Sequence, residues 1–493
     1  MPGVHAIFAN PAEAPVRPNV VLILADDLGK YDLSSYGGQL ISTPNIDRLA
    51  SRGALFQHAY ASAAICSPSR MGLLCGQYQQ RYGFDFQPHQ RYPRSWVGRL
   101  AATALMAKDG WVPAKQVKRA PSKRQAKASG IPAEAETIAE RLQKTGYQTA
   151  LFGKWHLGYA PEHHPLRHGF DHFYGFVEAY SLYASRKDPL VINAPVPLFA
   201  DKVQWKKRKG PRAIERNGRI LKEGRYLTDA ITEEAIQYIG SHKSGKPFFA
   251  LLSYNAPHAP WQAPRKIYEQ LPHIQDHHQR VYCAMVIALD RAIGRLLNYL
   301  DDQGLTQNTM ILLTSDNGVA SYNGHVNSRP LKGGKFTLFE GGVNVPLLAS
   351  WPVHIPAGAV MAEPVSLLDL SPTIAAAAGA GAGGFDGINL LPGLQGAKAF
   401  ASDRSLFWRS GYNLGIIKSP WKLILNEKDQ TCELFDLHAD PFEQRDQALQ
   451  RPQDMRILLG ELNQWNNTMR PPAWPHVVDY ETVINGKKYR FAI

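Results

Sequence analysis

The sequence predicts an α/β protein: a large domain with a mostly parallel mixed sheet between helices, followed by a small antiparallel α+β domain. Short apolar runs at residues 20–25, 149–152, 248–253 and 310–314 are separated by helix-length amphipathic stretches. This alternation is typical of a parallel sheet covered by helices on both faces. Each run also ends in polar or glycine-containing residues, and such sheets bind ligands beyond the carboxyl ends of their strands. We therefore expect the four strand ends to converge on one site.

Helices are predicted between these strands. Residues 134–145 place Ile138 and Leu142 on one face, and residues 281–300 repeat apolar side chains with helical spacing. Another helix is expected to begin near Met71. These helices would cover the sheet.

The chain length predicts two domains. Its 493 residues exceed the ~250–300 residues at which a single core stops growing. An Ala/Gly-rich stretch at 375–387 marks the expected connection, so we place the large domain at residues 16–386 and the small one at 387–493. The small domain should hold three short strands and a closing helix, at residues 412–417, 422–425, 433–437 and 455–466.

Composition narrows the class of protein. Hydrophobic residues make up 44 % and charged residues 20 %, which excludes a disordered or fibrous chain. No run approaches the ~18–20 apolar residues of a membrane span, so none is expected. The first 15 residues lack the basic start and apolar core of an intact signal peptide. The four cysteines, Cys66, Cys75, Cys283 and Cys432, are too scattered for a disulfide framework or a Cys-x-x-Cys metal site.

The net charge of +13 comes from two basic segments. Residues 91–130 hold ten basic side chains and one acid, and residues 201–225 hold ten basic side chains and three acids. Solvated loops are one interpretation of such runs. The other is a positive field that attracts a polyanion, either nucleic acid or an acidic polymer.

Carboxylates follow two of the predicted strands. Asp26 and Asp27 end the first, and Asp316 and Asn317 end the fourth. Either pair alone would be explained by caps or turns. Together at one sheet edge, oxygen ligands without sulfur or imidazole favour a hard cation, Ca²⁺ or Mg²⁺, over zinc.

Residues 66–70 read Cys-Ser-Pro-Ser-Arg and stand at the entrance of the helix predicted near Met71. They place Cys66 and Arg70 one helical turn apart at a helix N-terminus, which favours anions. An inert thiol at a proline-containing turn is the alternative. Lys154, His156, His258 and Lys335 lie in other strand-exit segments; gathered beside a divalent cation, they would grip a tetrahedral anion and move protons near neutral pH.

These motifs resemble type I sulfatases, which share the alkaline-phosphatase-like fold. The Cys-Ser-Pro-Ser-Arg segment is similar to the signature in which a separate maturation enzyme oxidises the cysteine, here Cys66, to Cα-formylglycine. The other matching segments follow in the family's order: Asp26-Asp27, residues 153–158, Ala256-Pro257-His258, residues 315–318, Lys335 and Glu340-Gly341-Gly342. The resemblance covers residues 18–387, and residues 433–441 resemble the family's small C-terminal domain.

The resemblance implies a metal site and a nucleophile. Asp26, Asp27, Asp316 and Asn317 would bind Ca²⁺, or less favourably Mg²⁺, together with an oxygen of the modified Cys66. The hydrated formylglycine would attack sulfur through one hydroxyl, which divides a difficult hydrolysis into two steps. An unmodified Cys66 should turn over poorly or not at all.

The resemblance also implies roles for the remaining residues. Arg70 and Lys154 would hold the nucleophile, and Lys335 would neutralise sulfate oxygens together with the metal. His258 would protonate the leaving alcohol. His156 would take the remaining hydroxyl proton, so that sulfate leaves and the aldehyde is restored.

Two positions depart from the family pattern, and two segments are long for it. Cys75 stands in a Leu-Cys-Gly-Gln segment where relatives often show Thr-Gly-Arg, and Asn344 stands where Arg is frequent, so both are expected to alter the pocket wall. The basic segments read as insertions beside the site, where substrate choice is decided. They favour a sulfated carbohydrate polymer, such as carrageenan or a glycosaminoglycan. The family and a polymeric substrate imply a periplasmic or secreted enzyme.

Two alternatives remain. One is a phosphate or phosphonate ester hydrolase of the same superfamily. The other is a non-catalytic polyanion-binding protein, which would leave the strand-end clusters unexplained. Nucleic acid is not the expected partner, because no helix-turn-helix, zinc finger or RNA-binding signature accompanies the charge. The oligomeric state is left open.

Overall fold

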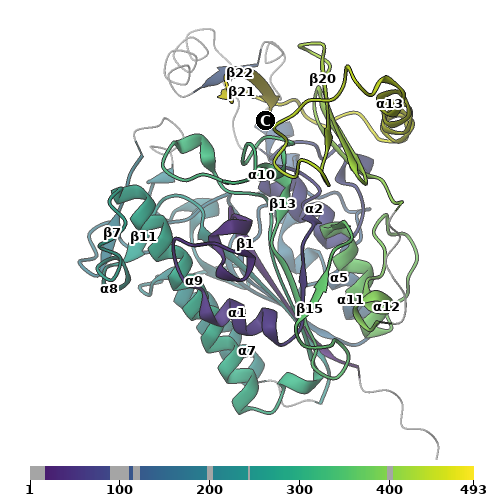
Figure 1. Cartoon of the computed structure of the whole chain (residues 1–493). Helices are drawn as coiled ribbons and strands as arrows, with labels where there is room; N and C mark the ends of the chain where they lie inside the picture. Colours follow the sequence, from purple (N-terminus) through teal and green to yellow (C-terminus); the bar gives the residue numbers. More distant parts are fainter. Residues whose placement is uncertain (1–16, 89–109, 115–122, 197–203, 242–244, 397–402) are drawn as a thin grey trace, which may run out of the picture.

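The largest sheet of the molecule has ten strands, in the order β15-β2-β14-β12-β1-β10-β5-β6-β8-β9 (Figure 1). The computed structural model describes residues 17–88, 110–114, 123–196, 204–241, 245–396 and 403–493. Five neighbouring strands form a parallel block: β12 (Thr309–Ser315), β1 (Asn19–Asp26), β10 (Phe248–Pro257), β5 (Gln148–Lys154) and β6 (His172–Phe176). Around it lie β14 (Leu347–Ser350), β2 (Ala54–Phe56), β15 (Ala359–Met361), β8 (Glu215–Arg216) and β9 (Arg219–Ile220). Because β14 and β8 pair antiparallel with this block, the predicted mostly parallel mixed sheet is confirmed.

The central strand β1 is buried along its whole length. Val21 and Ile23 enter the core on one face of the sheet, and Val20, Leu22 and Leu24 enter the core on the other. Such a two-sided strand reads as a continuous apolar run rather than an alternating one. That is why the sequence showed it so plainly.

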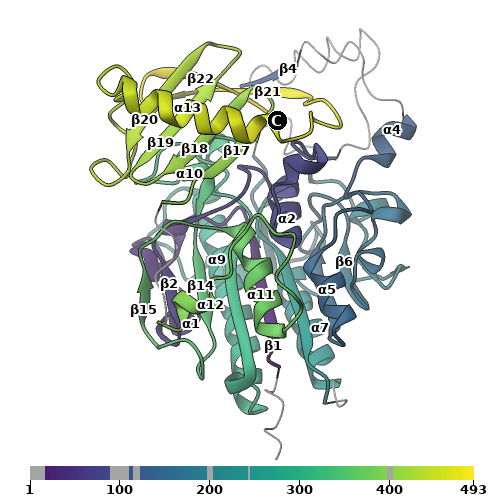
Figure 2. The same cartoon turned by 90° about the vertical axis from the view of Figure 1, so that its right-hand side faces the viewer.

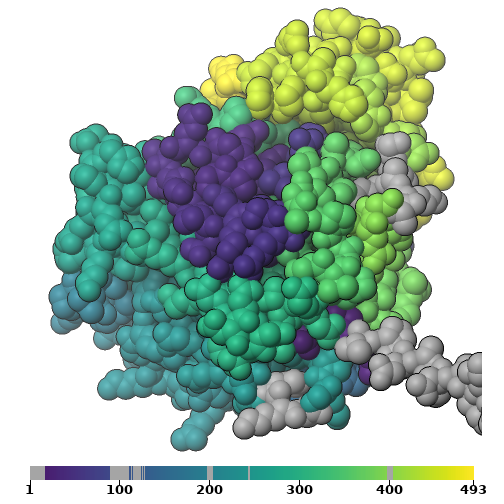
Figure 3. Space-filling view, turned by 60° about the horizontal axis from the view of Figure 1, so that its bottom comes forward, coloured from purple at the N-terminus to yellow at the C-terminus, as the bar shows by residue number. Residues whose placement is uncertain are grey.

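Helices cover both faces of the sheet. The core on one side takes side chains from α1 (Pro44–Ser51), α7 (Leu227–Ser241) and α9 (His277–Asp302), and the core on the other side takes them from α2 (Cys66–Cys75), α5 (Ile138–Lys144) and α11 (Leu370–Ala378). In a space-filling view from below, the purple N-terminal segment lies against teal and green parts of the chain that come much later in the sequence (Figure 3). Among the described residues no helix is long and apolar enough to cross a membrane.

Helix boundaries differ from the predicted ones because of capping. α5 begins at Ile138 rather than at residue 134, since Thr137 accepts a hydrogen bond from the Glu140 backbone and Glu140 bonds back to the Thr137 backbone. This capping box satisfies backbone donors that the first helical turn leaves free. α9 begins four residues before the predicted start, where Asp276 accepts a hydrogen bond from the Gln279 backbone.

A small antiparallel α+β unit follows, as predicted. Its four-stranded sheet joins β17 (Leu406–Ser410), β18 (Asn413–Lys418), β19 (Trp421–Asn426) and β20 (Thr431–Asp436), and α13 (Pro452–Asn467) packs against it. A second sheet joins β21 (Val478–Ile484), β22 (Lys487–Ala492) and β4 (Trp111–Pro113). β4 belongs to the first basic segment. Figures 1 and 2 place the yellow C-terminal elements above the end of the large sheet where α2 and α10 (Glu340–Val343) lie.

A buried ion cluster joins the C-terminal unit to α10. Lys422 Nζ lies 2.8 Å from Glu340 Oε1 and 2.9 Å from Glu443 Oε1, and all three side chains are at most 3 % exposed. Glu443 also accepts a hydrogen bond of 2.8 Å from the Glu340 backbone. One buried cation therefore contacts two carboxyl groups at this junction, and burial raises the pKa of one of them, Glu443, to about 7.

We expect Lys422→Ala to lower the free energy of unfolding by about 3–5 kcal/mol, because two carboxylates would stay buried without their cation. Lys418→Ala is the matched control. Its partner is Glu461, its side chain is 38 % exposed, and such a pair contributes about 1 kcal/mol or less. Urea unfolding at neutral pH measures both values, and equal losses in the two variants would contradict the prediction.

Candidate active site

The polar ends of four strands meet at one edge of the large sheet. β12, β1, β10 and β5 are neighbours, and Ala25 of β1 pairs with Ser315 of β12. Asp26 lies in register with Pro257, one residue before His258. The parallel register therefore brings together side chains that are far apart in the sequence.

The acidic residues form a buried, oxygen-rich cluster. Asp26, Asp27, Cys66 and His258 each offer a ligand atom within 4.8 Å of the others. Asp27 Oδ2 and Asn317 Oδ1 are buried without a hydrogen-bond partner. Two buried oxygens without partners, beside further carboxylates, are the donor set that suits a hard cation such as Ca²⁺.

Cys66 is the first residue of α2 and is buried inside this cluster. Its Sγ lies 3.4 Å from Asp26 Oδ1 and 3.1 Å from Lys335 Nζ. Burial raises the pKa of the Cys66 thiol far above its ordinary value, although Lys154 and Lys335 oppose the shift. Because the thiolate is the reactive form of cysteine, an unmodified Cys66 is a poor nucleophile at neutral pH.

Three buried cations contact the carboxylates of the cluster. Arg70 Nε lies 2.7 Å from Asp316 Oδ2, Lys154 Nζ 2.7 Å from Asp26 Oδ2, and Lys335 Nζ 2.5 Å from Asp27 Oδ1. Three positive side chains thus balance three negative ones. A bound divalent cation would make this site net positive, which suits an anionic substrate.

The two aspartates at the end of β1 stay ionised in spite of their burial. Burial raises the pKa of Asp26, but Lys154, His258 and Arg70 together hold it below its ordinary value. Burial likewise acts to raise the pKa of Asp27, but Lys335 and His258 hold this pKa below its ordinary value. Both side chains can therefore act as anionic ligands at neutral pH.

The two predicted histidines face the same cluster. Both ring nitrogens of His156 are buried without a partner, and burial together with Lys154 and Arg70 holds its pKa well below the ordinary value. His258 Nε2 lies 3.7 Å from Asp27 Oδ2. Burial lowers the pKa of His258, although Asp26 and Asp27 oppose the shift. Neutral imidazoles of this kind accept and return protons.

The backbone around the cluster is strained. Asp27, His156 and Phe336, which follows Lys335, have φ angles of 64°, 63° and 77°. Positive φ is unfavourable for residues with a side chain, and it persists where the surrounding structure enforces it. Gly318 is required for a different reason: a Cβ at that position would lie 1.9 Å from the Gly341 carbonyl oxygen. Because of this close approach, the segment after β12 packs directly against α10.

Several supporting residues were not predicted. Ser253, in the middle of β10, accepts a hydrogen bond of 2.6 Å from Arg70 and donates one of 2.6 Å to the Lys154 carbonyl. Tyr282 of α9 donates to the Asp27 carbonyl at 3.2 Å. Ser253 ends an apolar run in the sequence, and this position could have identified it as a residue near the site. Tyr282 lies within the regular apolar pattern of a helix and gives none.

The two departures from the family pattern lie away from the cluster. Asn344 is buried and donates a 2.7 Å hydrogen bond to Glu340, and Lys30 Nζ lies 3.4 Å from its amide oxygen. Cys75 is buried in the apolar core beneath the sheet. Both therefore belong to the supporting structure, and the expectation that they alter the pocket wall finds no contact to support it among the described residues.

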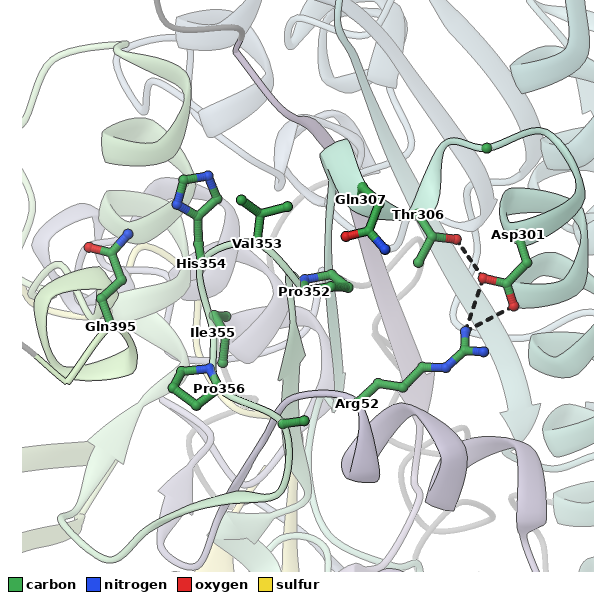
Figure 4. Close-up of a pocket in the computed structure, with 12 residues that line it drawn as sticks. Arg52, Asp301, Thr306, Gln307, Pro352, Val353, His354, Ile355, Pro356 and Gln395 are labelled. Atoms are coloured by element: carbon green, nitrogen blue, oxygen red, sulfur yellow. Dashed lines mark hydrogen bonds and ion pairs between the residues drawn. The ribbon is translucent and has the colours of Figure 1, made fainter.

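A pocket of about 630 Å³ lies outside the candidate active site (Figure 4). Arg52 and Asp301 form an ion pair at one side of it, and Pro352 and Val353 line another. Thr306 in its wall precedes β12, whereas Asp316 follows that strand. The pocket is therefore at the opposite end of the sheet from the candidate active site.

The second basic segment is partly internal. Arg208 donates to the carbonyls of Leu182, Tyr183 and Glu223, whereas Lys206, Lys207 and Lys209 are exposed. Two further arginines form ion pairs with glutamates: Arg216 with Glu234, and Arg225 with Glu223, Glu233 and Glu234. Of the first basic segment, residues 91–109 and 115–122 lie outside the described residues.

The buried cysteine at a helix start, with three carboxylates and three cations at the end of a parallel sheet, suits the hydrolysis of an anionic ester. The Sulfatase family model matches residues 18–380, and the chain belongs to this family. It is therefore a sulfuric ester hydrolase.

Relatives support the assignment. Human N-acetylgalactosamine-6-sulfatase is 34 % identical over 409 residues, covering 81 % of this chain and 70 % of the relative. Arylsulfatase H of Canis lupus familiaris is 30 % identical, covering 81 % and 76 %. A crystal structure of Ps i-CgsB in complex with k-i-k-neocarrahexaose is 32 % identical, with a TM-score of 0.78 and coverage of 93 % and 94 %.

Proposed function

We propose that this enzyme removes sulfate from a sulfated carbohydrate, in polymeric or oligomeric form. The observation that carries the proposal is the buried cluster of three carboxylates and three cations around Cys66. The relatives support the substrate class, since one is named for N-acetylgalactosamine 6-sulfate and another was crystallised with a neocarrahexaose. A polymer outside the cell would require a periplasmic or secreted enzyme, and this location is part of the proposal.

Conversion of Cys66 to formylglycine by a maturation enzyme is the second part of the proposal. The thiol itself is protonated at neutral pH because of its burial, so it cannot serve as the nucleophile. The hydrated aldehyde would supply one hydroxyl that attacks sulfur and a second whose deprotonation expels sulfate by C–O cleavage. Lys335 Nζ lies 3.1 Å from Sγ, close enough to contact a sulfate group that is attacked by the new oxygen.

Asp26, Asp27, Asp316 and Asn317 would hold Ca²⁺, with Mg²⁺ as the less suitable ion. The orphaned oxygens of Asp27 and Asn317 fit this interpretation. The ion would supply positive charge to the sulfate oxygens. Without the ion, the negative charges of the three carboxylates and the positive charges of the three cations cancel.

The remaining residues would position the substrate and move protons. Lys335 would bind a sulfate oxygen, and Arg70 and Lys154 would keep the nucleophile and its aspartates in place. His258, whose Nε2 faces Asp27, would protonate the leaving alcohol. His156, which has two free ring nitrogens, would accept the proton whose loss releases sulfate.

The substrate proposal is tested by sulfate release from carrageenan, a glycosaminoglycan, their oligosaccharides, a small aryl sulfate and a matching phosphate ester. We expect a clear preference for the sulfated carbohydrates. Equal rates on the aryl sulfate and on the polymers would remove the support for a carbohydrate substrate. A preference for the phosphate ester would instead favour a phosphate or phosphonate hydrolase.

Joint replacement of Lys206, Lys207 and Lys209 by serine tests the role of the exposed charge. We expect the kcat/KM for a sulfated polymer to fall about tenfold at low salt, because a positive field accelerates encounter with a polyanion. The kcat/KM for the aryl sulfate should stay unchanged. Loss of activity on both substrates would show that the lysines act on the fold instead.

A further inference from the structure

A second group of metal-ligating side chains lies outside the candidate active site. Asp276, His278 and His325 each place one ligand atom within 4.8 Å of the others. Asp276 caps α9 and His278 stands in its first turn, whereas His325 lies in the segment between β12 and α10. Three potential ligands from two distant parts of the chain therefore meet at one point.

The spacing of two of these ligands suits a metal ion. His325 Nδ1 lies 3.2 Å from Asp276 Oδ2. Two ligands of a tetrahedral zinc ion, each ~2.0–2.1 Å from the metal, lie about 3.3 Å from one another. Without an ion this contact is a hydrogen bond, and its length equals the spacing of neighbouring ligands, so an ion that displaces the shared proton would fit between the two atoms.

His278 supplies the third donor. Its ring stacks on that of His325, with centroids 3.9 Å apart and planes 20° apart. Because the lone pairs of parallel rings do not converge, one ring has to turn to complete the site. His278 Nε2 donates to the Pro195 carbonyl oxygen at 3.2 Å, so Nδ1 is the ring nitrogen left to bind an ion.

The adjacent His277 is not a fourth ligand. Its Nδ1 lies 3.0 Å from the Tyr268 hydroxyl and its Nε2 lies 3.4 Å from the Asn193 carbonyl oxygen. Both ring nitrogens are therefore used. Water would complete the coordination at this open, partly exposed site.

We propose that Asp276, His278 and His325 form a site for a divalent transition metal ion of the Zn²⁺ type. Two imidazoles with one carboxylate suit zinc, copper or nickel, whereas the oxygen-rich cluster around Asp26 suits calcium. The ion would tie the start of α9 to the segment that leads to Lys335. α9 also carries Tyr282, which bonds to the Asp27 carbonyl, so occupancy would stiffen two sides of the candidate active site.

Calorimetric titration of the Ca²⁺-saturated enzyme with Zn²⁺ tests this site. We expect one equivalent of Zn²⁺ to bind, and His278→Ala and His325→Ala each to weaken binding by at least ~10–100-fold, because each removes a ligand. His273→Ala, which changes an exposed histidine just before α9, is the matched control and should bind as the wild type does. Zn²⁺ should also raise the Tm of the wild type more than that of either variant.

A second variant separates this site from the active site. Asp27→Asn should retain the Zn²⁺ equivalent, because Asp27 is not one of the three ligands. Loss of Zn²⁺ binding in Asp27→Asn would place the ion in the active site and overturn the proposal. Absence of saturable binding in the wild type, or unchanged affinity in folded His278→Ala and His325→Ala, would overturn it as well.

Discussion

Replacing Cys66 with alanine is expected to abolish sulfate release, with kcat reduced about 10⁴-fold or more, as for other enzymes that lose their nucleophile. The side chain is the first residue of α2 and lies between Asp26 and Lys335 at 3.4 and 3.1 Å. Few other groups in the cluster could replace it, because the lysines and Arg70 are bound to carboxylates. Steady-state kinetics with a chromogenic aryl sulfate would measure the loss.

Cys75→Ala is the matched control for this prediction. Cys75 ends the same helix, is equally buried and lies in the apolar core. It should keep near wild-type kcat even if its stability falls. Peptide mass analysis of the wild type adds a direct test of the modification. Unmodified Cys66 in fully active enzyme would contradict the formylglycine proposal.

Replacing Asp27 with asparagine is expected to lower kcat/KM by about 10³-fold or more. The change removes one of the three buried negative charges and leaves Lys335 Nζ, now 2.5 Å from Asp27 Oδ1, without its counter-ion. It also weakens the proposed Ca²⁺ site. A metal contributes several kcal/mol to transition-state charge stabilisation, and each ~1.4 kcal/mol corresponds to a tenfold change in rate.

Removing the metal with a chelator separates the contribution of the ion to activity from that of the Asp27 side chain. Treatment of the wild type with EGTA should remove most of its activity, and Ca²⁺ should restore it, whereas Asp27→Asn should gain little from added Ca²⁺. Asp301→Asn is the control, since Asp301 pairs with Arg52 at the far end of the sheet (Figure 4) and is 30 % exposed. Full activity of the wild type after complete removal of metal would contradict the Ca²⁺ proposal.

The large sheet was predictable because its central strands are buried on both faces. The apolar runs of β1 and β12 are therefore continuous, and acidic residues stand at the end of β1 and directly after β12. α7 was not predicted: its buried face mixes Leu227 and Ile231 with small and polar residues such as Ala230 and Thr228. The pairing of β4 with β21 could not be predicted either, because it joins residues near 112 and 479.

A count of charged residues in the basic segments does not show which side chains are free to bind a polyanion. Arg208 and Arg225 appeared in the sequence as part of a surplus, yet they bind carbonyls and carboxylates of the surrounding chain. A guanidinium group acts as a structural donor wherever the fold brings acceptors to it. Among the described residues of the second basic segment, Lys206, Lys207, Lys209, Arg219 and Lys222 are exposed and remain available to a polyanion.

The sequence by itself determined the class of fold and the residues of the candidate site, because strand periodicity and local motifs are written along the chain. Tertiary structure alone decided the charge balance of that site, the orphaned oxygens of Asp27 and Asn317, and the meeting of Asp276 with His325. The reason is physical. Charge, burial and coordination depend on distances between residues that only the register of neighbouring strands and the packing of helices bring together.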